Sequence, residues 1–197
     1  AVHNASATAP EQIGVTFSAV GSSGATAANG TLASTNLLTS RPRLVLTSSI
    51  IVNNDSRLAG SPLAWWFGNA AGLGGFRVEF DFGVVTTQTT MRIAVGLKST
   101  SSFVLSTNEP SALTDFIAMT CDAGDTNMQI MHNDGSGTAT KVDLGSSFPK
   151  TANVVYRAVF EAAANGSTVD YEVTRLDRSA TASGTLSSNL PSSTTLM

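Results

Sequence analysis

The chain has 197 residues, of which 42% are hydrophobic and only 13% charged, with a formal net charge of −3 and a pI of about 5.2. This length fits a single β-sandwich domain, and the charged fraction is roughly half the ~25% usual in globular proteins. A weakly acidic chain has no positive field for phosphate backbones or anionic lipid, so we expect no nucleic-acid partner. With one cysteine, Cys121, no internal disulfide can form.

The chain divides into an arm and one domain. Residues 1–12 are rich in alanine and are predicted to be an N-terminal arm or linker, followed by a single β-sandwich domain over residues 13–197. The most apolar stretch, residues 63–76, contains several glycines and is shorter than the ~20 residues that a bilayer span needs. We therefore expect no membrane insertion.

In the first half of the chain, alternation of apolar and polar residues predicts several strands. Ile13, Val15 and Phe17 indicate a short strand, and residues 43–52 are dense in β-branched residues. In residues 75–83 four large apolar side chains alternate with Arg77, Glu79 and Asp81, so one face packs and the other meets water. Residues 91–97 repeat this pattern, and we expect the two segments to pair as antiparallel neighbours.

The sequence of the second half predicts short strands and tight turns. Residues 106–114 are expected to carry one helical turn, and residues 116–121 a strand. Two hairpins are predicted from Asp-Gly and Asn-Gly steps, which favour the positive φ of such turns. They join residues 127–132 to 138–144 and residues 153–161 to 168–176, and residues 181–186 follow as a last edge strand. The fold class expected is all-β: a two-sheet antiparallel β-sandwich of jelly-roll or concanavalin-like type.

Residues 116–148 carry a distinctive series of short motifs. They include Gly-Asp-Thr-Asn at 124–127, Asn-Asp-Gly at 133–135 and Lys-Val-Asp-Leu-Gly at 141–145. This run resembles a module in fibre and appendage proteins of tailed bacteriophages, and the similarity extends over roughly residues 75–190. The resemblance implies a lectin-like sandwich, often at the end of a trimeric fibre, that meets the host surface. The location it implies is the virion, assembled in the host cytoplasm.

The resemblance brings no catalytic signature, so we expect no enzyme. Similar proteins would have another strand after Leu190-Pro191, where this chain stops at Met197. Either the sequence is a fragment or a neighbouring subunit supplies the edge. Residues 181–186 carry no charge, and natural sheets usually guard free edges with charge or proline. We therefore expect contacts with other virion proteins and sister subunits, as a homotrimer.

Trp65-Trp66-Phe67 forms the only tryptophan cluster, on a glycine-flanked loop. Exposed indoles stack on sugar rings, whereas buried ones close the end of a core or a subunit contact. The second interpretation is favoured, and Trp65 and Trp66 are kept as candidate ligand-binding residues.

Asp122, Asp125 and Asn127 share one short turn. Clustered oxygen ligands suit calcium, yet Asp and Asn also make turns by bonding their own backbone, and no EF-hand spacing is present. We favour turn chemistry, keep the three as candidate ligand-binding residues, and assign no metal or cofactor.

Glu79 and Asp81 lie on one sheet face, as the carboxylates of some jelly-roll glycoside hydrolases do. The strand in those enzymes has a pattern that resembles Glu-x-Asp-x-x-Glu, whereas here Val84 stands at the third acidic position. A polysaccharide depolymerase is therefore the least favoured function. A histidine-centred triad would have to use His132, which lies at the start of a hairpin turn, and no Gly-x-Ser-x-Gly elbow accompanies it.

Three functions remain open. The leading hypothesis is a phage virion surface or tail-fibre domain that adheres to a host cell-surface glycan or receptor, because a low-charge surface rich in serine and threonine suits hydrogen bonding to sugars. The alternative is a structural capsid-decoration or fibre-assembly domain without a ligand. The third is the depolymerase.

Overall fold

The computed structural model of the chain describes residues 16–21, 25–48, 54–61, 65, 67–68, 70–99 and 103–197. Within these ranges it has twelve β-strands and one 3-10 turn, η1, and no helix long and apolar enough to cross a membrane. The elements are β1 Thr16–Gly21, β2 Thr26–Asn29, β3 Leu44–Thr47, β4 Ser56–Ser61, β5 Phe76–Gly83, β6 Ile93–Lys98, η1 Pro110–Ala112, β7 Phe116–Cys121, β8 Gln129–Asn133, β9 Thr140–Asp143, β10 Val155–Ala162, β11 Val169–Arg175 and β12 Ala180–Leu186.

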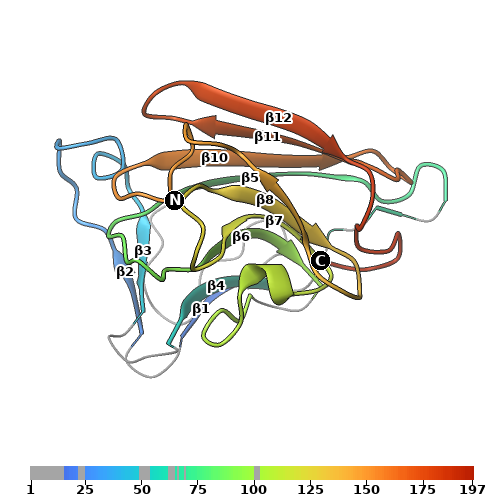
Figure 1. Cartoon of the computed structure of the whole chain (residues 1–197), viewed down its shortest axis with the longest axis horizontal. Coiled ribbons are helices and arrows are strands. Elements are labelled where there is room, and N and C mark those ends of the chain that lie inside the picture. The colour runs from blue at the N-terminus through green and yellow to red at the C-terminus, as the bar shows by residue number, and fades with distance from the viewer. Residues whose placement is uncertain are drawn as a thin grey trace.

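Two four-stranded antiparallel sheets form the body of the molecule. One has the order β12-β11-β10-β5 and the other β6-β7-β8-β9, and the first lies above the second in Figure 1. The prediction of an all-β, two-sheet antiparallel sandwich is confirmed.

The core fills the space between these sheets because each contributes one apolar row. Tyr156 and Phe160 of β10 meet Ile117 and Met119 of β7 in one large cluster of buried side chains. Strand β7 is buried along its whole length, since a second, smaller cluster on its other face is covered by residues 103–113, including Phe103. Its near-continuous apolar sequence follows from burial on both faces.

Both predicted hairpins are present. Strands β8 and β9 pair across the Asp-Gly turn, and β10 and β11 pair across the Asn-Gly turn, in which Asn165 has a φ of 56°. The predicted helical turn corresponds to η1, and β12 is an edge strand as expected.

The predicted pairing of residues 75–83 with 91–97 is wrong. Strand β5 pairs with β10, and β6 pairs with β7 in the opposite sheet. Alternation shows which face of a strand is buried but not which strand lies beside it. The connection between β5 and β6 passes from one sheet to the other, and buried Val84 lies at its start.

The N-terminal part forms two small sheets, β1-β4 and β2-β3, beside the sandwich. The predicted strand over residues 43–52 is shortened to β3, with residues 49–53 outside the described ranges. The predicted arm, residues 1–12, lies outside them too. Leu38 attaches this part to the sandwich by packing on Gly83, where an added Cβ would lie 2.8 Å from the leucine side chain.

Candidate ligand-binding surface

The outer face of the β12-β11-β10-β5 sheet is a polar grid. Alternation directs every second side chain outward, and the strand register aligns these side chains in three rows across the sheet. The rows are Arg77-Glu161-Asp170-Thr185, Glu79-Val159-Glu172-Ser183 and Asp81-Arg157-Thr174-Thr181. The grid has charged side chains toward β5 and hydroxyl side chains along β12.

An open depression of about 430 Å³ lies on two of these rows. Its lining residues are Arg77, Val159, Glu161, Asp170, Tyr171, Glu172, Ser183, Gly184 and Thr185. Gly184 faces the inner side of the sheet opposite Tyr171, and a Cβ on it would lie 2.8 Å from the tyrosine hydroxyl. A small residue at this position is therefore required by the approach of the ring.

The depression has an excess of negative charge, with three carboxylates and one guanidinium. Glu161 and Asp170 stand directly opposite each other, an arrangement that is unfavourable for like charges. Arg77 offsets part of this repulsion with its Nε 3.6 Å from Glu161 Oε2, and Asp170 accepts a hydrogen bond of 2.6 Å from Thr185. The side-chain carboxylate of Glu172 makes no hydrogen bond or ion pair to any residue that the structure describes, so it is available to a ligand.

Outside the depression, Arg157 pairs with Glu79 and Asp81, the two carboxylates that the depolymerase hypothesis required. Its guanidinium donates two hydrogen bonds of 2.8 Å to Asp81 and lies 3.0 Å from Glu79. The hydrogen bond from Arg157 lowers the pKa of Asp81. Retaining hydrolysis needs one carboxyl group that holds a proton near neutral pH, and this lowered pKa does not suit Asp81 to that role.

The turn with Asp122 and Asp125 already holds a cation, the side chain of Lys141. The lysine Nζ lies 3.1 Å from Asp122 and 2.8 Å from Asp125. Burial would raise the pKa of Asp122, but hydrogen bonds from Ser111 and Lys141 outweigh it and lower that pKa. The third predicted residue, Asn127, donates to Asp143 at 3.3 Å. No three acidic, histidine or cysteine side chains among the described residues are placed to hold a metal ion.

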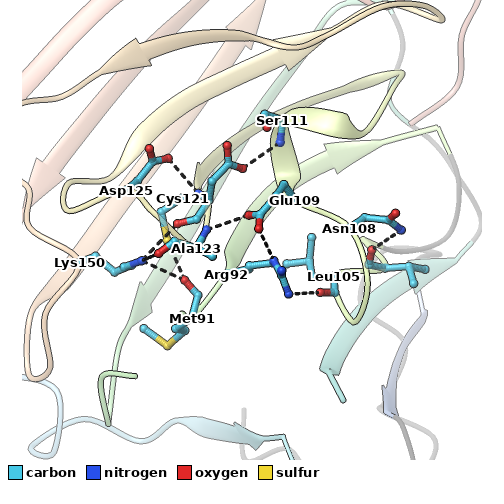
Figure 2. A network of polar contacts seen from close by, with 12 residues as sticks. Met91, Arg92, Leu105, Asn108, Glu109, Ser111, Cys121, Ala123, Asp125 and Lys150 are labelled. Carbon is cyan, nitrogen blue, oxygen red and sulfur yellow. Dashed lines mark hydrogen bonds and ion pairs between the residues drawn. The ribbon is translucent and has the colours of Figure 1, made fainter. Parts of the chain in front are cut away.

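A second lysine, Lys150, also holds this turn in place. It lies in the loop that leads into β10 of the other sheet. Buried Lys150 donates from its Nζ to the carbonyl oxygens of Met91, Asp122 and Ala123 at 3.0–3.2 Å (Figure 2). Beside it, Glu109 accepts from the Ala123 N–H at 2.8 Å and pairs with Arg92 (Figure 2). We call these contacts of Lys150 and Glu109 the clasp, because they hold the turn in its conformation.

Three other predicted residues lie apart from the depression. Trp65 packs against the main core, and its backbone exchanges two hydrogen bonds with Met197, whereas Trp66 is outside the described residues. Cys121 is buried, as predicted, and burial raises the pKa of its thiol to about 12. His132 is also buried, with its Nδ1 3.0 Å from the Asn189 carbonyl oxygen, and burial lowers its pKa.

The structure thus brings together residues that the sequence did not single out. Of the predicted candidates that the structure describes, Trp65, Asp122, Asp125 and Asn127, none lines the depression. The available signal was the alternation of polar residues along strands β10, β11 and β12, which places every second side chain on the outward face. The β10-β11 hairpin brings Glu161, Asp170 and Glu172 together, whereas Arg77 joins them only through the pairing of β10 with β5, which is distant in sequence.

Comparison of the chain with protein-family models, with curated proteins and with solved structures gave no match. The molecule is therefore defined by its fold and surface. It is an antiparallel β-sandwich with an acidic, hydroxyl-lined depression on the exposed face of one sheet.

Proposed function

We propose that the chain is a virion surface domain of tailed-bacteriophage type that binds a host cell-surface glycan through the depression on the β12-β11-β10-β5 sheet. The observation that carries this proposal is the set of side chains in the depression. Carboxylates and hydroxyls are groups that hydrogen-bond the hydroxyls of a sugar, and the Glu172 carboxylate has no partner among the residues that the structure describes. The resemblance to phage fibre modules adds the biological setting.

The charge of the depression narrows the class of glycan. Glu161, Asp170 and Glu172 outnumber Arg77, so an anionic sugar would meet like charge and lose hydration without compensation. A neutral or amino-bearing sugar avoids that repulsion, and an amine gains a charge-assisted hydrogen bond to Glu172. We expect binding to neutral and amino sugars and exclusion of sialylated, uronate-rich or phosphorylated ones.

A glycan array probed with the intact assembly, together with host-cell adsorption, tests this proposal. Glu172→Gln should weaken binding about tenfold or more, because a charge-assisted hydrogen bond contributes about 1.5–3 kcal/mol. Asp81→Asn is the matched control, since it removes a carboxylate on the same face whose partners Arg157 and Arg41 lie outside the depression. An array that stays blank, or equal losses in both variants, contradicts the proposal.

A structural capsid-decoration or fibre-assembly role is the second candidate, and one observation favours it. The small N-terminal sheets expose Leu46 on β3 and Leu58 on β4, at 37% and 46% of their surface. Contacts with sister virion chains would cover such side chains. Placing the chain within the intact particle separates the two functions: a distal tip favours adhesion, and a capsid lattice position favours decoration.

A further inference from the structure

Strand β12 is the least protected of the four edge strands of the sandwich sheets. The sandwich sheets end in four strands, and three of them carry charge: Arg77, Glu79 and Asp81 on β5, Lys98 on β6, and Lys141 and Asp143 on β9. Strand β12 has seven residues with neither charge nor proline, and β11 is the only described strand that pairs with it. It forms the upper boundary of the molecule in Figure 1. Such an edge is open to strand addition.

The sequence of β12 is nearly symmetric about Ser183. Thr181 and Thr185 flank this serine on the outward side, and Ala182 and Gly184 flank it on the inward side. Antiparallel pairing of two identical strands around a two-fold axis places residues equally far from the axis opposite each other. With the axis at Ser183, each Thr181 faces a Thr185, which is a favourable cross-strand pair, and Ala182 faces Gly184 without steric conflict.

From this juxtaposition we infer that β12 is a homodimerisation edge, at which a second copy of the chain adds its own β12 in antiparallel register centred on Ser183. The two four-stranded sheets then become one sheet of eight strands. No like charges face each other across the junction, because every residue of β12 is uncharged. One seven-residue strand buries little surface, so the association is weak and depends on concentration.

The pairing also has a consequence for the proposed function. This consequence rests on the proposed function, whereas the pairing itself does not. The two-fold axis is perpendicular to the sheet, so the depressions of both copies open on the same face. Strand β11 of one copy lies three strand spacings, about 14 Å, from β11 of the other. Ser183, Gly184 and Thr185 of each copy line the central part of a surface that presents two sugar sites at once. Bivalent attachment to a dense glycan layer would follow.

Cysteine cross-linking measures the register directly. Ser183→Cys should form a disulfide-linked dimer under mild oxidation, because opposite residues in an antiparallel pair have Cα atoms about 4.5–5.5 Å apart, within disulfide range. Thr174→Cys is the matched control: it faces outward one strand further in and should stay uncross-linked. A mixture of Thr181→Cys and Thr185→Cys chains should cross-link to each other. The native Cys121 is buried and does not interfere.

Sedimentation of the wild-type chain provides an independent measurement that needs no variant to fold. The mass should rise with concentration from 20.3 kDa toward twice that value. Ser183→Lys should shift this equilibrium to the monomer by opposing two ammonium groups at the axis, and Thr174→Lys should leave it unchanged.

A wild-type chain that stays monomeric, a three-fold mass, or equal cross-linking of Ser183→Cys and Thr174→Cys would overturn the inference. Sugar binding is scored separately on the array. Loss of dimerisation with binding intact therefore refutes the edge alone, and dimerisation without binding refutes the glycan proposal alone.

Discussion

The sandwich and the N-terminal sheets of this chain obtain their order in different ways. Strands β7, β8, β10 and β11 bury most of their side chains in a shared core. Among the described residues between 25 and 61, only Leu38 and Asp55 are buried. An isolated two-stranded sheet is marginal in water. The N-terminal sheets therefore depend on what they are attached to, while the sandwich supplies its own stability.

The attachment between the two regions is of the kind found at surfaces. Beyond the packing of Leu38 on Gly83, it includes a hydrogen bond of 3.2 Å between Asn36 and Asn153. An ion pair of 3.8 Å joins Arg41 to Asp81, and both side chains are exposed by more than a third. Exposed pairs of this kind contribute about 0–1 kcal/mol. The contrast teaches that one chain can combine a self-sufficient scaffold with a region whose side chains remain available for assembly.

The largest expected loss of stability comes from creating a cavity in the sandwich core. Phe160→Ala on β10 removes a fully buried ring and should lower the free energy of unfolding by about 3–5 kcal/mol in urea titrations. Leu58→Ala on β4 is the counterpart, and at 46% exposure it should change stability by no more than about 0.5 kcal/mol. Equal losses would contradict the division into two regions.

The next effect concerns the clasp at Lys150. Lys150→Met should cost about 2–3 kcal/mol, because three partly buried carbonyl oxygens lose their charged donor while the apolar stem is kept. Lys141→Met is the matched control: its ion pairs are partly exposed, and their loss should cost at most about 1 kcal/mol. Thermal and urea unfolding of both variants measure the difference. A Lys150→Met variant as stable as wild type would show that the clasp contributes nothing.

The division between the two regions also explains what the sequence could predict. Strands of the sandwich are visible because their alternation reflects one-sided burial, as in residues 75–83, and because Asp134-Gly135 and Asn165-Gly166 mark the turns. The partner of β5 was not predictable, since pairing is set by packing between segments about 80 residues apart. For the same reason the whole depression was missed: Arg77 reaches Glu161 only through the pairing of β5 with β10.

A smaller effect should appear in the pH dependence of stability. Burial lowers the pKa of His132 below its ordinary value of 6.5, so below that pH the unfolded chain binds a proton that the folded chain does not. Stability is then fully present above about pH 6.5 and falls as the pH drops, with a slope of at most about 1.4 kcal/mol per pH unit. Carboxylates such as Asp81 and Asp122 titrate in a separate, lower range, because their pKa values lie below 3.8.

Unfolding titrations between pH 7 and 5 measure this slope. His132→Gln should flatten the profile, and His3→Gln, which changes the other histidine, is the control. A wild-type stability that stays constant over this range, or a slope that persists in His132→Gln, would contradict the assignment.

The smallest expected effect is an absence of response to calcium. Lys141 places an ammonium group between Asp122 and Asp125, where a divalent ion would have to displace it, and Asn127 is engaged with Asp143. Calcium at about 1 mM, a concentration that suits low-affinity extracellular sites, should therefore leave the melting temperature of the wild-type chain unchanged relative to a chelator. A rise in that temperature that disappears in Asp125→Asn would show instead that the turn binds the ion and that Lys141 gives way to it. Because ligand binding to the folded state must raise stability, the thermal measurement decides between an internal ion pair and a metal site without any need to observe the ion itself.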